Sequence, residues 1–135
     1  MPGKDLFTLA PDLTRVAPRS ARVQLGAYLM AARTLDKCRA DLADRAGSYH
    51  YNCPLDRVLF NFTGIKSEEF KDFVATGAGD EEVAQWIEQK SQIRDPDRVA
   101  EWNRKFRMNP VIWLMEFDDW LHTRRNASSS ASSRI

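Results

Sequence analysis

The sequence contains no long run of apolar residues. None of its segments approaches the ~18 apolar residues that a membrane-spanning helix needs, and its start lacks the apolar core of a signal peptide. Cysteine is also scarce. Cys38 and Cys53 are the two present, and two cysteines in a cytosolic domain of this size are rarely a structural disulfide. We therefore expect a cytoplasmic protein with reduced thiols and no membrane partner.

An excess of charge of one sign is missing too. The chain has 20 basic and 19 acidic residues, a net charge of +1, whereas domains that bind nucleic acid through bulk charge carry a basic excess. We therefore expect no nucleic-acid binding. Basic side chains dominate residues 14–45 and acidic ones residues 67–88, so an anionic ligand would prefer the first region. Two solvated faces of opposite sign would give the same pattern.

Motifs of the large enzyme classes are absent as well. The chain has no Gly-rich phosphate loop, no Gly-x-Ser-x-Gly elbow and no dinucleotide fingerprint, which argues against the major nucleotide-binding and hydrolase folds. His50 and Cys53 are metal-ligand residue types, but they lack the paired spacing that is typical of a zinc site. We expect neither a metal nor a cofactor.

Apolar residues with helical spacing dominate what the chain does contain. They recur every three or four residues from Leu25 to Ala46, behind a Ser20 N-cap and ahead of a Gly47 stop, which predicts one long helix of about seven turns. Cap and proline signals predict shorter helices, each about three turns long. These begin near Pro54, Ser67, Asp80, Pro96 and Pro110.

These patterns predict an all-α protein with a single domain over residues 20–125. One long N-terminal helix is expected to carry four or five shorter helices packed on it. Residues 1–19 contain Pro11 and Pro18 and are expected to form an extended arm. Residues 126–135 are rich in Ser and Ala and have nothing to bury, so we interpret them as a disordered or artificially appended tail.

The last predicted helix is apolar on more than one face. Over residues 111–121 only Glu116, Asp118 and Asp119 are charged, which indicates that the helix is either buried on several sides or meets a partner. Burial within the domain is the more common cause. A homodimer formed through Trp113, Phe117 and Trp120 is the alternative.

Residues 47–56, between two predicted helices, hold an unusual share of reactive side chains. They include one of the two His, one of the two Cys and two of the three Tyr, where a connector is normally Gly, Ser, Asn and Pro. His50 and Cys53 are the candidate catalytic residues, since Cys53 falls at a predicted helix N-terminus and His50 could orient toward it if the loop folds back. Alternatively, the tyrosines anchor the loop and Cys53 is a small buried side chain.

Polar residues near the predicted long helix suggest a site for an anion. Arginines flank the Ser20 cap, where they oppose the helix dipole, and a bound carboxylate or phosphate would explain them. Pairing with acidic residues such as those at 68–72 would explain them equally well. The candidate ligand-binding residues are Arg19, Arg22, Tyr28, Lys37, Arg39, His50, Tyr51, Asn52 and Asp56.

Two functional hypotheses follow from these features. In the first, the protein binds a small anionic molecule, or acts on it as a small enzyme, between the Arg-rich start of the long helix and the His-Tyr-Asn-Cys loop. In the second, it is a non-catalytic interaction or self-association module that uses its aromatic C-terminal helix.

Several strings of the sequence resemble a small bacterial family known as a domain of unknown function, number 5069. The most specific is Tyr-His-Tyr-Asn-Cys-Pro-Leu-Asp at residues 49–56, and Leu-Asp-Lys-Cys-Arg-Ala at residues 35–40 accompanies it. The resemblance covers roughly residues 12–93. It implies a compact, mostly helical cytoplasmic domain and supplies no activity or catalytic residues.

Overall fold

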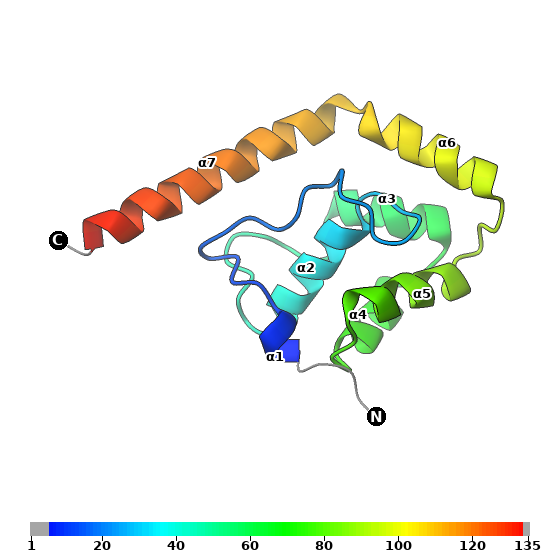
Figure 1. The fold of residues 1–135 in the computed structure, drawn as a ribbon, viewed down its shortest axis with the longest axis horizontal. Coiled ribbons are helices and arrows are strands. Elements are labelled where there is room, and N and C mark those ends of the chain that lie inside the picture. Colours follow the sequence, from blue (N-terminus) through cyan, green and yellow to red (C-terminus); the bar gives the residue numbers. More distant parts are fainter. Residues whose placement is uncertain (1–5, 134–135) are drawn as a thin grey trace.

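The computed structural model describes the backbone of residues 6–133 and the side chains of residues 6–124. This part of the chain forms seven helices and no strand beyond an isolated bridge between Leu25 and Tyr28 (Figure 1). The predicted all-α class is therefore confirmed. The helices are α1 (Leu6–Leu9), α2 (Ala31–Leu42), α3 (Pro54–Thr63), α4 (Ser67–Val74), α5 (Asp80–Lys90), α6 (Pro96–Arg107) and α7 (Pro110–Ser133).

Helix α2 is the centre of the molecule. Its first ten residues, 31–40, are all buried beneath α3, α4, α5, α7 and the N-terminal segment (Figure 1). Small residues such as Ala31, Ala32 and Ala40 let other segments approach its backbone closely. Four of its buried residues are nevertheless charged, namely Arg33, Asp36, Lys37 and Arg39. Buried charges are tolerated only when they are paired, and each of these four has a partner from another segment.

The predicted long N-terminal helix is not confirmed. Residues 20–30 form turns instead, because Gly26 and Met30 adopt the left-handed conformation, with φ of 58° and 71°, which interrupts a right-handed helix. Ser20 accepts the backbone N–H of Arg22 within one of these turns. At the other end, α2 stops at Leu42, ahead of the left-handed Asp44. It therefore spans 12 residues, half the 24 of α7.

The starts of the shorter helices agree with the prediction. Pro54 and Pro96 occupy the first position of α3 and α6, where a missing N–H costs nothing. Asp95 caps α6 by accepting the N–H of Asp97 at 2.9 Å. These local signals do not depend on tertiary structure, and the helices begin where they predicted.

Aromatic side chains join the shorter helices to one another and to the loop ahead of α3. Phe70 of α4 is fully buried and contacts the rings of Tyr51, Phe60 and Trp86, a burial that contributes about 1.5–3 kcal/mol. Trp102 of α6 stacks on Phe62 of α3 with ring centroids 5.0 Å apart. Together these contacts join α3 to α4 and to α6, and α4 to α5.

Helices α6 and α7 meet at an angle and run along one side of the molecule (Figure 1). Helix α7 continues to Ser133, into the segment for which the sequence led us to expect no regular structure. No helix in the described part of the chain, α7 included, joins the length and the apolar character that a membrane crossing requires.

Candidate functional site

A surface pocket of about 270 Å³ lies where α2, residues 48–55 and α7 meet. We call it the loop pocket. Helix α2 contributes Arg33 and Lys37 to its wall, and the loop contributes Tyr49, His50 and Cys53. Helix α7 closes the opposite side with Met115, Asp118, Asp119 and His122. The pocket therefore combines side chains from segments that are up to 89 residues apart, from Arg33 to His122.

Residues 43–53 are shaped by three positions in the left-handed conformation, Asp44, Gly47 and Asn52. Gly47 has φ of 59°, and a Cβ there would lie 3.0 Å from the carbonyl oxygen of Leu13, so a side chain would be both strained and crowded against the backbone. Asn52 has φ of 62°, a conformation that Asn tolerates better than most residues. Between them Tyr51 anchors the loop, since its hydroxyl donates to the carbonyl of Ser67 at 2.6 Å. This leaves His50 exposed and Cys53 half-buried.

Lys37 lies at the junction of the pocket and the core. Its ammonium is 2.9 Å from a carboxylate oxygen of Asp56 and donates to the sulfur of Cys53 at 3.1 Å. Asp56 is fully buried and also accepts the hydroxyl of Thr34 at 2.7 Å and the backbone N–H of Cys53 at 3.3 Å. A buried ion pair needs such additional hydrogen bonds to offset the loss of hydration. The network fixes Lys37 and Cys53 relative to each other.

A second charged group connects the pocket to α7. Arg33 forms two hydrogen bonds with the carboxylate of Asp119, at 2.6 and 3.1 Å, and Tyr49 donates its hydroxyl to the same carboxylate at 3.0 Å. Burial, together with the nearby charge of Asp119, raises the pKa of Tyr49 well above its usual value. The ring of His122 lies against Tyr49, and its Nε2 is 3.1 Å from the carbonyl oxygen of Leu13.

The arginines that suggested an anion site are bound to carboxylates of the protein. Arg19 contacts Asp36 at 2.9 Å and Asp80 at 2.8 Å, and Arg39 shares Asp80 at 2.9 Å. Although burial lowers the pKa of Arg19, its bonds to the two aspartates outweigh this and leave the pKa raised. None of the ion pairs of these two arginines involves residues 68–72.

Arg22 is occupied as well, by helix α7. Its Nε lies 3.0 Å from the carboxylate of Glu116, and its guanidinium stacks on the ring of Trp113 at 3.9 Å. The contact with Glu116 is an ion pair without hydrogen-bond geometry, because Nε has no hydrogen-bond partner among the described residues. Arg19, Arg22 and Arg39 therefore hold the fold together, and none of them lines the loop pocket.

A family model described as Domain of unknown function (DUF5069) matches residues 15–129 of the chain. The chain belongs to the DUF5069 family. The match continues well beyond residue 93, where the resemblance in the sequence ended, so that α6 and most of α7 lie within the family region. No curated protein matches the chain.

Of the residues that the sequence singled out, this DUF5069 structure brings Lys37, His50 and Cys53 together in the pocket. Asp56 lies beneath them as the buried partner of Lys37. The rest have other contacts. Tyr28 is buried with its hydroxyl 3.0 Å from that of Ser91, and Tyr51 bonds the backbone of Ser67, whereas Asn52 lines a different surface pocket.

Sequence reasoning missed the contribution of α7 and of Arg33. A signal was present, because Glu116, Asp119 and His122 recur every three residues in a segment whose one other charged residue is Asp118, which places them on one helix face. That polar face is the one that contacts the rest of the DUF5069 domain. Among the described residues, no group of three or more His, Cys, Asp or Glu side chains is arranged to hold a metal ion.

Proposed function

We propose that this DUF5069 protein binds a small molecule with an anionic group in the loop pocket. The observation that carries the proposal is the position of Lys37, a cationic side chain that is almost fully buried yet lines a pocket at the surface. An ammonium has three N–H donors, and its two described side-chain partners are Asp56 and Cys53. A third bond to an anionic oxygen would complete its coordination.

The wall of the pocket also indicates what else the ligand carries. Arg33, Lys37 and His50 are on one side, whereas Asp118 and Asp119 come from α7. Asp118 is exposed, and Asp119 is shared between Arg33 and Tyr49. A ligand with a hydrogen-bond donor or a cation at the end facing Asp118 complements this wall better than a simple anion does. A volume of about 270 Å³ suits a small metabolite rather than a macromolecule.

Binding is better supported than nucleophilic catalysis by Cys53. A general base must lie about 2.6–3.2 Å from the group whose proton it takes. No described contact joins His50 to Cys53, and the sulfur is instead 3.1 Å from the ammonium of Lys37. We therefore assign His50 and Cys53 as ligand contacts at the rim and the floor of the pocket.

Thermal unfolding in the presence of a panel of small carboxylates, phosphates and amino acids tests the proposal. A compound at 100 times its dissociation constant stabilises the folded state by about 2.7 kcal/mol, which corresponds to a rise in Tm of several degrees. His50→Ala should reduce that rise while leaving the Tm of the free protein within about 2 °C, because an exposed surface substitution changes stability by less than about 0.5 kcal/mol. Gln85→Ala on the exposed side of α5 is the matched control.

Two results would contradict the proposal. One is that no compound in the panel raises the Tm. The other is that a compound does raise it, but His50→Ala and Gln85→Ala respond to that compound as the unchanged protein does, which would place its binding site elsewhere.

A further inference from the structure

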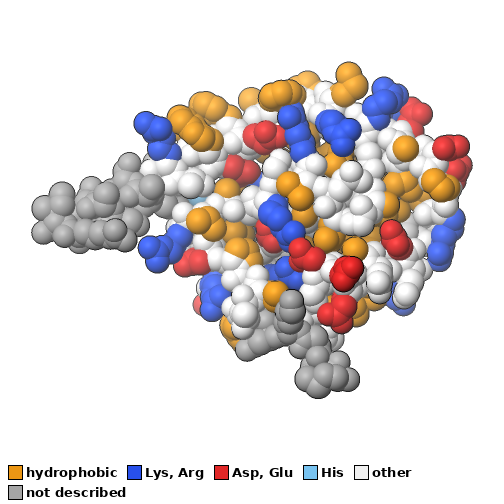
Figure 2. Space-filling model, viewed as in Figure 1, with side chains coloured by type: hydrophobic (Ala, Val, Ile, Leu, Met, Phe, Trp, Pro, Cys, Tyr) orange, Lys and Arg blue, Asp and Glu red, His pale blue; other side chains and the backbone are white. Residues whose placement is uncertain are grey.

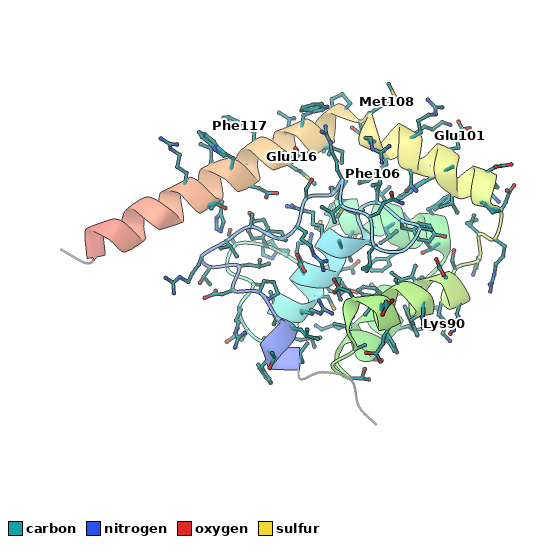
Figure 3. All side chains as sticks on the ribbon, viewed as in Figure 1. Lys90, Glu101, Phe106, Met108, Glu116 and Phe117 are labelled. Atoms are coloured by element: carbon teal, nitrogen blue, oxygen red, sulfur yellow. The ribbon has the colours of Figure 1, made fainter. Side chains whose placement is uncertain are left out.

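Helix α7 exposes a stripe of large apolar side chains. Trp113, Leu114, Phe117 and Trp120 are between 53% and 70% exposed. Figure 3 shows Phe117 pointing away from the domain while its neighbour Glu116 points toward it. In Figure 2, hydrophobic side chains gather along the edge of the molecule formed by α6 and the first half of α7. We call these four side chains the outer stripe of α7.

The orientation of α7 is the reverse of that of an ordinary surface helix, which buries its apolar face. The face toward the domain carries Glu116, Asp119 and His122, bound to Arg22, Arg33 and the backbone of Leu13. Ile112 is its one fully buried large apolar side chain among the described residues. Turning the helix about its axis would break all three polar contacts. The polar contacts of the face toward the domain, which we call the inner face, therefore keep the outer stripe turned toward solvent.

We propose that the outer stripe is the interface of a homodimer in which α7 packs antiparallel against α7 of a second copy. Trp113, Phe117 and Trp120 follow the alternating four- and three-residue spacing of a helix that packs along another helix. The partner must offer a matching apolar helix face, and among residues 6–124, whose side chains the structure describes, α7 itself offers an exposed helix face with that spacing. Self-complementary use of one patch is the rule in twofold dimers.

The exposed area of the outer stripe agrees with binding of a second copy of the chain. Large apolar side chains have about 150–250 Å² of surface, so the exposed fractions leave on the order of 500 Å² on these four residues. A standard interface buries ~800 Å² per partner, of which ~60% is apolar. The outer stripe supplies that apolar share, and it reaches the size at which exposed patches on soluble proteins mark interaction sites.

The position of Arg124 selects the antiparallel arrangement. It continues the same spacing four residues beyond Trp120, and its guanidinium lies 5.1 Å from that ring. A parallel pair would place Arg124 directly opposite the partner's Arg124, which is unfavourable. An antiparallel pair centred on Phe117 separates the two arginines by about 21 Å, at 1.5 Å per residue, and brings Trp113 against the partner's Trp120.

Sedimentation velocity of the full chain at about 50 µM, well above a micromolar dissociation constant, tests the dimer. We expect a species of twice the 15.5 kDa mass of one chain. Phe117→Glu should convert it to a folded monomer and weaken association at least 100-fold. Val58→Glu, at an exposed apolar site on α3, should leave it dimeric. A wild-type monomer at this concentration, or equal dissociation by both variants, would overturn the proposal.

Disulfide trapping separates the two orientations. In a Cys53→Ser background, Trp113→Cys alone should not cross-link to itself under mild oxidation, whereas a mixture of Trp113→Cys and Trp120→Cys chains should form the mixed disulfide. Efficient self-linking of Trp113→Cys would overturn the antiparallel arrangement. These measurements are independent of any ligand, so their failure leaves the proposed function of the loop pocket standing.

Discussion

One carboxylate beneath the loop pocket, Asp56, has three partners and no exposure to solvent. It lies 2.9 Å from Lys37 and accepts hydrogen bonds from Thr34 and from the backbone N–H of Cys53. Asp56→Asn keeps the shape of the side chain and removes its charge. The ammonium of Lys37, itself 3% exposed, would then be buried without a counter-charge.

The expected loss of stability is large for this reason. Removing one partner of a buried ion pair typically costs about 3–5 kcal/mol, out of a total free energy of unfolding of about 5–15 kcal/mol for a domain. The matched control is Asp41→Asn. Asp41 and Lys71 are 2.8 Å apart, as close as the buried pair, but both side chains are about 40% exposed. An exposed pair contributes about 0–1 kcal/mol. The two ion pairs thus have nearly the same length, but the Asp56–Lys37 pair is buried and its carboxylate also accepts hydrogen bonds from Thr34 and Cys53.

Urea unfolding followed by tryptophan fluorescence measures both variants. We expect Asp56→Asn to lower the free energy of unfolding by at least 2 kcal/mol more than Asp41→Asn does. Adding Lys37→Met to Asp56→Asn removes the unpaired charge and should restore most of the loss, because an apolar replacement of a buried pair is often neutral. Equal and small losses in the two single variants would show that Lys37 is hydrated, and would refute the description of this site.

Two further predictions concern thiols and acid. A thiol reagent should label Cys53 in the native protein and Cys38 only after unfolding, because Cys38 is fully buried and burial raises its pKa to about 12. Rapid labelling of both thiols in the native protein would contradict the packing around α2. Acid should destabilise the protein below pH about 4. Burial opposes the ionisation of Asp80, but its bonds to Arg19 and Arg39 outweigh burial and lower its pKa. A lowered pKa contributes stability above the pKa of the unfolded chain and loses it as pH falls through the folded value, so Asp80→Asn should flatten the acid limb of a stability-versus-pH curve.

Helix starts were predictable from the sequence because their signals are local. A proline at the first position or a capping side chain acts within one turn, and these signals located α3 and α6. The start of α2 could not be found in this way. Met30 adopts a φ of 71° while fully buried, and nothing in a methionine indicates a left-handed conformation. The apolar residues of 20–30 keep a helical spacing in the sequence, but in the folded protein tertiary packing stabilises turns there instead of a helix.

The site was predictable only in the part that comes from adjacent segments. Lys37, His50 and Cys53 lie within 17 residues of sequence. An unusual loop composition pointed to His50 and Cys53, and the basic residues of the predicted long helix pointed to Lys37. The ion pairs of α2 connect residues up to 86 positions apart, as Arg33 and Asp119 are. Charge alone does not say which of many carboxylates an arginine will meet, so the sequence could not distinguish a bound anion from an internal partner.

The buried charges of α2 also explain why an apolar face is left exposed. The buried charges of α2 form ion pairs with the N-terminal segment, α3, α5 and α7, and the pair with α7 joins Arg33 to Asp119. If α7 docked through Trp113 and Phe117 instead, apolar burial would increase, but Arg33 would be left buried without a counter-charge, at a cost of about 3–5 kcal/mol. The inner face also provides one wall of the loop pocket. The ion pair thus selects the orientation of α7, and that orientation both completes the pocket and leaves exposed the outer stripe, for which we propose a second copy as the partner.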